Sequence, residues 1–339
     1  MEKQPLLEVK DLKTNFYTEN GVVTAVDGIS FTVEEGEIVG VVGESGCGKS
    51  VTSQSILRLF DEEYTAQYEG AISFKGENLL KKPLSTMHDL RGNEISMIFQ
   101  DPSSALNPVY TIGKQVAESM RLHRNVSKKE AHEKAIKLLE MMGIPSPEKR
   151  ANEYPHQLSG GMLQRAMIAM ALACEPDLLI ADEPTTALDV TIQAQILDLM
   201  VRLNKEMGMA MMFITHDLGV VAQICDRVVV MYLGQIVEEA DVKTLFSNPV
   251  HPYTKGLIQS IPQVDGLRPE KLHVIKGTVP TLNNVPTGCR FAERCAFSDS
   301  RCFQQAPELE AHTEGHKVRC WNAHEIAKKE VNAYEAINL

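Results

Sequence analysis

The first third of the chain alternates short apolar runs with turn residues. AVDGISFTV (25–33) and AISFKG (71–76) predict strands of an antiparallel layer. The run Glu37–Gly43 is instead continuous, rich in β-branched residues and closed by glycine, which predicts a strand buried on both faces. A glycine-rich turn and a helical segment follow it. Residues 94–100 (EISMIFQ) predict another short strand.

Residues 101 to about 165 change to a composition rich in helix formers. The clearest helix begins after Ser127, which can cap it, and Glu130 stands at the capping-box spacing. Gly143 and Pro145 then end the helix. This stretch interrupts the strand pattern, so we predict an inserted helical subdomain.

Strand and helix alternate again between residues 177 and 240. DLLIADEP (177–184) and AMMFITH (210–216) predict buried strands. The helix between them has one apolar face, formed by Ile192, Ile196, Leu199 and Leu203, and Gly208 ends it. A strand, a long helix and a strand form a βαβ unit, which requires a parallel sheet and predicts an α/β fold. Beyond about residue 245 prolines multiply, which predicts a separate C-terminal appendage.

The composition narrows the class of protein. The 339 residues suffice for two domains of about 150 residues each, and 43% hydrophobic with 23% charged residues excludes wholesale disorder. The net charge of −11, from 34 basic and 45 acidic residues, argues against a nucleic-acid partner. No apolar run approaches the roughly 18 residues of a membrane span, and MEKQPLLEVK lacks the apolar core of a secretory signal. We therefore expect a cytoplasmic protein that reaches a membrane only through partners.

Residues Gly43 to Ser50 (GESGCGKS) match the pattern G-x-x-x-x-G-K-[ST]. In this pattern the glycines let backbone N–H groups turn toward phosphate oxygens, and the N-terminus of the following helix adds its dipole. Lys49 would reach the β- and γ-phosphates, and Ser50 would bind Mg²⁺. The alternative, an unrelated glycine-rich turn, is disfavoured because a predicted strand precedes the loop and a predicted helix follows it.

Polar residues stand at the ends of three predicted strands. Beside a phosphate-binding loop, Asp182 is suited to hold Mg²⁺, and Glu183 faces elsewhere and could activate water as a general base. Gln100 and His216 could both reach the γ-phosphate or its water. The structural alternatives are a solvated acidic pair and a histidine without a chemical role.

The segment Leu158–Met162 (LSGGM) precedes a further helical pattern, Leu163–Ala173. A serine and paired glycines at a helix start form a second anion site, with a plain N-cap as the alternative. One nucleotide does not need two such sites from one chain. We therefore expect two subunits to enclose two nucleotides between them. Asp189 precedes another helix, where simple capping is again the alternative.

Four of the seven cysteines, Cys289, Cys295, Cys302 and Cys320, lie within one short stretch. In a reducing compartment such a cluster indicates metal ligation rather than disulfides. The C-x5-C-x6-C-x17-C spacing can surround a tetrahedral site but is neither a zinc-ribbon nor a ferredoxin pattern, so the spacing does not choose the metal. His312 and His316 are reserve ligands that we expect to be exposed.

Together these motifs resemble the ATP-binding-cassette (ABC) ATPases over about residues 5–245. The corresponding segments are Gly43–Ser50 (Walker A), Gln100 (Q-loop), Leu158–Met162 (signature), Leu178–Glu183 (Walker B), Asp189 (D-loop) and His216 (switch histidine). Met162 departs from the usual glutamine of the signature. The resemblance implies a P-loop NTPase (RecA-like) core with an antiparallel β layer, the helical insert and a small cysteine-containing C-terminal extension.

The resemblance also implies a set of site residues. ATP would be held by Phe16 or Tyr17 stacking on adenine, by Gly43, Glu44, Ser45, Gly46, Cys47, Gly48, Lys49, Ser50 and Val51, and by Ser159, Gly160, Gly161 and Asp189. For Phe16 and Tyr17 the alternative is packing within the sheet. Ser50, Gln100 and Asp182 would hold Mg²⁺, and Glu183, His216 and Gln100 would be catalytic.

The C-terminal segments 251–262 (HPYTKGLIQSIP) and 286–295 (PTGCRFAERC) resemble the extension of dipeptide and oligopeptide importer ATPases. This divides the chain into an ABC nucleotide-binding domain, 1–245, and an extension, 246–339. Some relatives hold an iron–sulfur cluster there, which implies a [4Fe–4S] cluster on the four cysteines, with zinc or plain thiols as alternatives.

The implied function is ATP hydrolysis that drives peptide uptake at the cytoplasmic face of the cell membrane. The implied partners are a second ATPase subunit in a head-to-tail nucleotide-sandwich dimer, either a paralogue or a second copy, and two transmembrane permease subunits. A peptide-binding protein outside the membrane would act indirectly. Related nickel or glutathione importers share much of this pattern. A soluble ABC ATPase of DNA repair or translation is the alternative from another class.

Overall fold

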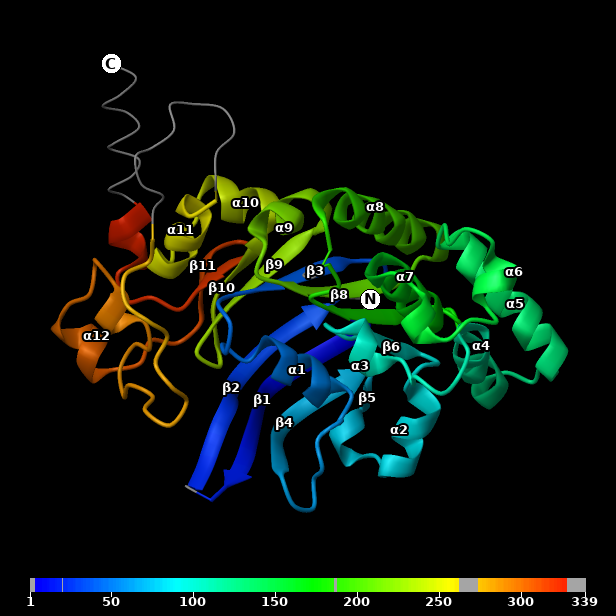
Figure 1. Cartoon of the computed structure of the whole chain (residues 1–339). Coiled ribbons are helices and arrows are strands. Elements are labelled where there is room, and N and C mark those ends of the chain that lie inside the picture. The colour runs from blue at the N-terminus through cyan, green and yellow to red at the C-terminus, as the bar shows by residue number, and fades with distance from the viewer. Residues whose placement is uncertain (1–3, 20, 186–187, 262–273, 328–339) are drawn as a thin grey trace.

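The computed structural model describes residues 4–19, 21–185, 188–261 and 274–327 (Figure 1). Its strands are β1 (Leu7–Thr18), β2 (Gly21–Val33), β3 (Ile38–Val42), β4 (Ala66–Phe74), β5 (Glu77–Asn78), β6 (Ile95–Ile98), β7 (Leu178–Asp182), β8 (Ala210–Thr215), β9 (Arg227–Tyr232), β10 (Gln235–Asp241), β11 (Glu310–Thr313) and β12 (His316–Val318). Its α-helices are α1 (Lys49–Ile56), α2 (Leu84–Leu90), α3 (Pro102–Ala105), α4 (Ile112–His123), α5 (Lys128–Met141), α6 (Pro147–Arg150), α7 (Gly160–Ala171), α8 (Val190–Met207), α9 (Leu218–Ile224), α10 (Val242–Ser247), α11 (Pro252–Gln259) and α12 (Ser300–Gln304). Short 3-10 helices are η1 (Leu79–Lys81), η2 (Pro155–Gln157) and η3 (Ala292–Arg294).

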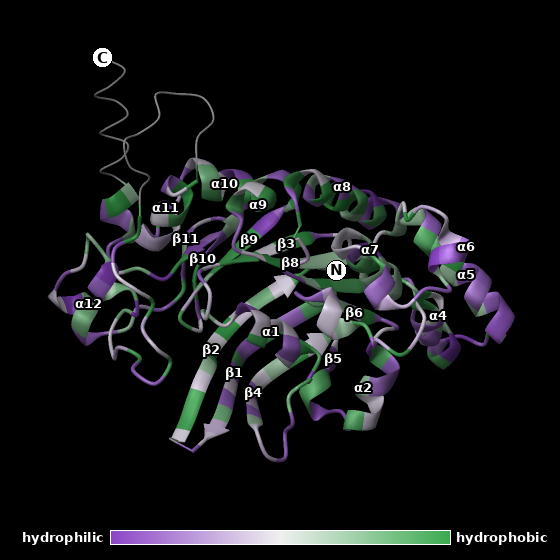
Figure 2. Ribbon diagram, viewed as in Figure 1, coloured by the Kyte–Doolittle hydropathy of each residue, from purple (hydrophilic) through white to green (hydrophobic). Residues whose placement is uncertain are grey.

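The larger sheet has the strand order β11-β12-β10-β9-β3-β8-β7-β6. The pairings β3–β8, β3–β9, β6–β7 and β7–β8 are all parallel, which confirms the predicted βαβ arrangement. Ile38 and Val42 of β3 pack on the face covered by α7 to α9, whereas Val39 and Val41 pack on the opposite face. Both faces are therefore buried, as the continuous apolar run predicts, and the central strands are green in Figure 2.

The smaller sheet is antiparallel, in the order β2-β1-β4-β5, and confirms the predicted antiparallel layer. Its strand β1 was not identified from the sequence. The register of β1 against β2 shifts between Val9 and Leu12, and Asp11 has a positive φ of 47°. Such irregularities break the two-residue period by which a strand is recognised.

Helices α3 to α6 follow β6 and form the predicted insert, with α4, α5 and α6 at the right of Figure 1. Ser127 Oγ accepts a hydrogen bond from Glu130 N, and Gly143 has a φ of 70°, so both predicted ends of α5 are confirmed. The predicted start of α7 at Leu163 was wrong: α7 begins at Gly160, because Ser159 caps it and both glycines lie in its first turn. Among the described residues, no helix combines the length and the apolar character that crossing a bilayer requires.

The C-terminal extension is joined to the core and is not the separate appendage that the composition suggested. Its strand β12 pairs with β10, so the extension lengthens the larger sheet. Glu238 of β10 is fully buried and accepts hydrogen bonds from Val250 N (2.7 Å) and His251 N (3.0 Å), and it lies 2.8 Å from His316 Nε2. The expectation that His316 is exposed was therefore wrong, since Glu238 draws its ring into the core.

His251 provides a pH-dependent test of this joint. Burial lowers the pKa of His251 from 6.5 to about 4, although Glu238 opposes the shift. As the pH falls below 6.5, His251 becomes protonated in the unfolded chain but stays neutral in the folded chain. The free energy of unfolding should therefore fall between pH 6.5 and 4. We expect His251→Asn, which keeps an acceptor at the start of α11, to show a smaller fall in urea unfolding.

The matched control is His88→Asn, because His88 is exposed near the end of α2. His88→Asn should lose the same free energy as the parent protein over this pH range. An equal loss in His251→Asn and the parent would contradict the assignment to His251.

Candidate functional site

The loop between β3 and α1 has a conformation that depends on glycine. Gly43, Gly46 and Gly48 have φ values of 153°, 80° and 101°. A Cβ atom at Gly43 would lie 2.2 Å from the carbonyl oxygen of Met231, and one at Gly48 would lie 2.7 Å from that of Ala25. The backbone thus passes close to its neighbours, while Ser45 and Gly46 stay exposed at its outer side. Such a loop can direct N–H groups at an anion.

Lys49 is the first residue of α1, and it is buried with 5% of its surface exposed. Its ammonium group donates to the carbonyl oxygens of Gly43 (2.7 Å) and Glu44 (3.1 Å). The positive charge is therefore held across the loop, where it can neutralise a phosphate group.

Ser50 and Asp182 bring two oxygen ligands together from different elements. Ser50 Oγ donates to Asp182 Oδ1 at 3.0 Å, which links α1 to the end of β7. Burial raises the pKa of Asp182, because only 3% of its surface is exposed, and the neighbouring charge of Glu183 adds to this effect. A hydroxyl beside a carboxylate suits Mg²⁺, which prefers oxygen ligands and would stabilise the charged carboxylate.

Glu183 forms a second polar group with Gln100 and His216. Gln100 Nε2 donates to Glu183 Oε2 at 3.0 Å, and His216 Nδ1 lies 3.3 Å from Glu183 Oε1. Glu183 has a φ of 47°, in the left-handed region that a residue with a side chain rarely adopts. Its N–H donates to Ile214 O at 2.9 Å, which holds this strained backbone. The carboxylate is thus separated from that of Asp182 and is suited to accept a proton from water.

Most of these groups line one cavity of about 590 Å³, although Asp182 and Gly43 are not among the lining residues. It is lined by Ala25, Ser45, Gly46, Gly48, Lys49, Ser50, Val51, Gln100, Glu183, His216 and Leu282. The phosphate-binding loop and the strand-end residues therefore meet at one place. Ala25 and Leu282 were not identified from the sequence, because neither carries a polar group that would mark it.

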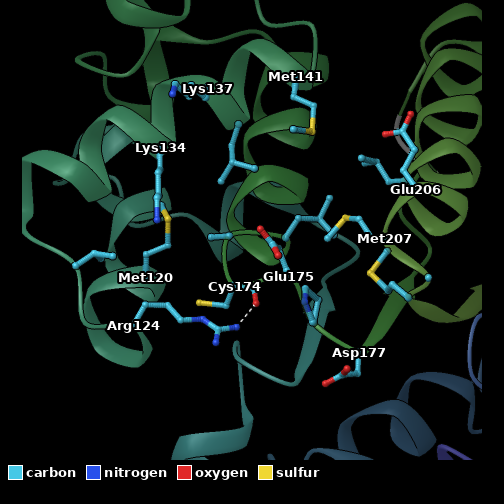
Figure 3. A pocket seen from close by; sticks show the side chains of 18 residues that line it. Met120, Arg124, Lys134, Lys137, Met141, Cys174, Glu175, Asp177, Glu206 and Met207 are labelled. Atoms are coloured by element: carbon cyan, nitrogen blue, oxygen red, sulfur yellow. Dashed lines mark hydrogen bonds between the residues drawn. The ribbon is translucent and has the colours of Figure 1, made fainter.

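A larger cavity, of about 1060 Å³, lies elsewhere, between the helical insert and the core (Figure 3). Met120, Met141 and Met207 contribute to its walls, and Arg124 donates across it to the carbonyl oxygen of Cys174 at 2.6 Å. None of the predicted nucleotide residues lines it. Size alone therefore does not identify the site, and we assign the chemistry to the smaller cavity.

Several predicted site residues lie away from the 590 Å³ cavity. Phe16 packs edge-on against Phe60 with ring centroids 4.8 Å apart, and the hydroxyl of Tyr17 donates to Gln67. The side chain of Cys47 is fully buried in the core, so Cys47 can contact a ligand only through its backbone. Glu44 lies in the loop, but it does not line the cavity.

The segment Ser159–Gly161 and Asp189 also lie outside the cavity lining. Ser159 and Gly160 are exposed, and Ser159 Oγ accepts from Met162 N at 3.4 Å. Asp189 caps α8 by accepting from Ile192 N at 3.0 Å. Within one chain, Ser159 and Asp189 thus act as helix N-caps, which was the alternative to a role in ATP binding.

The four clustered cysteines are brought near one another by the fold. All four are free thiols, and Cys289 N donates to Cys302 O at 2.7 Å. Burial raises the pKa of Cys320 to about 12, and the charges of the other three cysteines add to this effect. In the part of the chain that the structure describes, however, no three His, Cys, Asp or Glu side chains are arranged to hold a metal ion. The described side chains are therefore not arranged around a single metal ion such as zinc, and they do not by themselves show the predicted cluster.

Comparisons with known proteins agree with this geometry. Residues 26–186 match the family described as ABC transporter, and residues 237–302 match the oligopeptide/dipeptide transporter C-terminal region. The chain is 54% identical to "Probable peptide ABC transporter ATP-binding protein y4tR" of Sinorhizobium fredii, over 95% of this chain and 96% of that protein. It is 51% identical to the oligopeptide transport ATP-binding protein AppD of Bacillus subtilis, over 93% and 96% of the two chains.

Solved structures are similar over the core. The dimeric post-hydrolysis state of the ATP-binding cassette MJ0796, bound to ADP and Pi, superposes with a TM-score of 0.63 at 28% identity. The match covers 70% of this chain and 98% of that one. Part of this chain therefore lies outside that match, whereas the curated relatives span nearly the whole chain.

The position of Lys49 predicts the effect of removing its charge. In Lys49→Ala the loop loses the ammonium group that faces the cavity, so affinity for MgATP should fall by about tenfold or more. The measurement is a fluorescence titration with MgATP. Lys129→Ala removes the same charge from an exposed position on α5 and should bind like the parent. Equal affinities in both variants would contradict the assigned role of the loop.

Proposed function

The chain belongs to the ABC transporter ATPases, and we propose that it is the ATP-hydrolysing subunit of a membrane importer for dipeptides or oligopeptides. The observation that carries this proposal is the convergence of Lys49, Glu183, Gln100 and His216 on one cavity. The match of the C-terminal region to oligopeptide/dipeptide transporters supports the peptide substrate.

In the proposed reaction, Glu183 accepts a proton from water as the water oxygen attacks the γ-phosphorus. The bond from that phosphorus to the β–γ bridging oxygen breaks, which yields ADP and phosphate. Gln100 and His216, at 3.0 and 3.3 Å from the carboxylate oxygens, orient Glu183 and the water. Lys49 and the loop N–H groups neutralise the charge that develops on the phosphates.

Mg²⁺ would be held by Ser50 and Asp182, whose oxygen atoms are 3.0 Å apart, with Gln100 as a further ligand. When bound, the ion neutralises phosphate charge. Gln100 contacts Glu183 in this structure, so its proposed contact with Mg²⁺ requires a change of side-chain position once nucleotide is present.

In this proposal, each ATP also contacts a second ATPase subunit, which is a paralogue or another copy of this chain arranged head to tail. Ser159 and Gly160 are exposed and do not reach the cavity of their own chain. The similar cassette MJ0796, a dimer bound to ADP and Pi, supports this arrangement. The exposed Ser159 and Gly160 and the capping Asp189 would then face the nucleotide of the opposite subunit.

Two transmembrane permease subunits would dock near Gln100, beside the insert, and so hold the ATPase at the cytoplasmic face of the membrane. Phe99 precedes Gln100 in the chain, and Val109 and Tyr110 precede α4 of the insert; 38%, 69% and 41% of their surfaces are accessible. Exposed apolar side chains next to a catalytic glutamine suit a partner that must sense ATP. The peptide-binding protein would contact the permeases and not this chain.

We also propose that Cys289, Cys295, Cys302 and Cys320 hold a [4Fe–4S] cluster. The support is the presence of four thiols close enough to affect one another's ionisation. A cluster is wider than a single ion, so its thiolates stand farther apart than those around zinc. The raised pKa values mean that these thiols must release protons when they bind metal.

Glu183→Gln tests the proposed general base. The amide keeps the shape but cannot accept the proton, so turnover should fall by a factor of about 10² or more while ATP affinity stays within twofold. Steady-state phosphate release and an MgATP titration measure the two quantities. Glu148→Gln, at an exposed position on α6, is the matched control and should retain full turnover. Undiminished hydrolysis in Glu183→Gln would refute the proposed base.

Anaerobic purification tests the proposed cluster. The sample should be brown and contain about four iron atoms and four acid-labile sulfides per chain. Both should be lost in Cys295→Ser and retained in Cys225→Ser, because Cys225 lies outside the group. A colourless sample that contains zinc or no metal would exclude an iron–sulfur cluster.

A further inference from the structure

The C-terminal extension contacts the phosphate-binding loop directly. The first contact comes from Tyr253 on α11, whose hydroxyl oxygen accepts a hydrogen bond from Glu44 N at 2.8 Å. Tyr253 is fully buried against Tyr232 and Phe291, with ring centroids 4.8 and 5.4 Å away. This packing fixes the hydroxyl behind the loop, so the N–H of Glu44 is directed away from the cavity.

The second contact comes from Arg294 at the end of η3. Its guanidinium group binds the carboxylate of Glu44 through two parallel contacts, of 2.7 and 3.0 Å. Only 5% of the Arg294 side chain is exposed, and its Nε donates to Lys276 O at 3.0 Å. A two-pronged contact of this kind determines orientation as well as position. Both the backbone and the side chain of Glu44 are therefore held by the extension.

The third contact reaches the loop through the turn between β9 and β10. Arg290 donates to Leu233 O and to Asp27 Oδ2. The next residue, Gly234, donates its N–H to Cys47 O at 2.9 Å. Gly234 has a φ of 80°, and a Cβ atom there would lie 2.8 Å from Ala25 O, so this turn has little space in which to shift. The extension thus supports the loop at Glu44 and, through this turn, at Cys47.

We propose that Tyr253 and Arg294 are positioning residues for ATP binding: the C-terminal extension holds Glu44 and thereby sets the loop in its phosphate-binding conformation. This inference rests on the proposed ATPase function and deepens it. Neither residue lines the cavity. Leu282, which does line it, comes from the same extension. An ATP site that is completed by the extension would couple the state of the extension to nucleotide affinity.

The test uses the full chain with the Glu183→Gln change, so that ATP is bound but not consumed. Tyr253→Phe removes only the hydroxyl and keeps the packing, and Arg294→Gln removes the two-pronged contact. Each should weaken MgATP binding by about five- to tenfold, and Arg294→Lys should lie between Arg294→Gln and the parent. In the hydrolysing protein, the KM for ATP should rise while kcat at saturation stays within twofold.

The matched control is Arg301→Gln, because Arg301 belongs to the same extension but stacks on Trp321, 3.4 Å from the ring centroid. It should bind ATP like the parent. A double-mutant cycle between Glu44→Gln and Arg294→Gln should be non-additive, since each change removes the same contact. A purely additive cycle would overturn the proposal.

A merely structural role would give a different result: a lower melting temperature for Tyr253→Phe and Arg294→Gln with ATP affinity within twofold of the parent. That result would overturn the inference. Lys49→Ala separates this failure from failure of the proposed function. If Lys49→Ala loses ATP binding while the extension variants keep it, only the inference fails. If Lys49→Ala also binds normally, the site itself is wrong.

Discussion

The close passage of the loop between β3 and α1 against the neighbouring backbone is the constraint on which the rest of the site depends. Gly43 lies so close to the carbonyl of Met231 that no side chain fits, and this contact sets where the loop leaves the sheet. Because the loop is held there, Lys49 extends back over its carbonyl oxygens and Ser50 meets Asp182. A loop built from residues with side chains would leave this path and separate these groups.

The larger sheet supplies the second half of the site. Strands buried on both faces hold their ends rigidly, and the carboxyl ends of parallel strands lie on one edge. Asp182 ends β7 and Glu183 follows it, while Gln100 and His216 follow β6 and β8. Adjacent carboxylates consequently have different surroundings: Asp182 is buried beside Ser50, and Glu183 lies between Gln100 and His216. This separation suits one for a metal ion and the other for proton transfer.

The C-terminal extension is part of the core structure and is not a separate unit. Its strand β12 continues the sheet of the core, and the buried Glu238 joins it to the start of α11. Arg290 and Arg294 stand next to Cys289 and Cys295 in the chain, and each binds a group at or behind the phosphate-binding loop. Residues that flank two of the clustered cysteines therefore reach the loop between β3 and α1 or the turn behind it, although about 250 residues separate Glu44 from Arg294.

Features that depend on neighbouring residues in the chain could be predicted from the sequence. The Gly43–Ser50 loop, the buried strands, the helical insert and the family all follow from residue type and spacing, because glycine freedom, apolar periodicity and capping act over a few residues. Contacts between residues that are far apart in the sequence could not be predicted. Three features depend on which segments the tertiary structure brings together. They are the bulged strand β1, the burial of His316 against Glu238, and the hydrogen bonds of Tyr253 and Arg294 to Glu44. The sequence around Arg294 and Cys295 does not indicate that Arg294 binds Glu44, because these residues come together only when the distant segments of the chain pack in the folded protein.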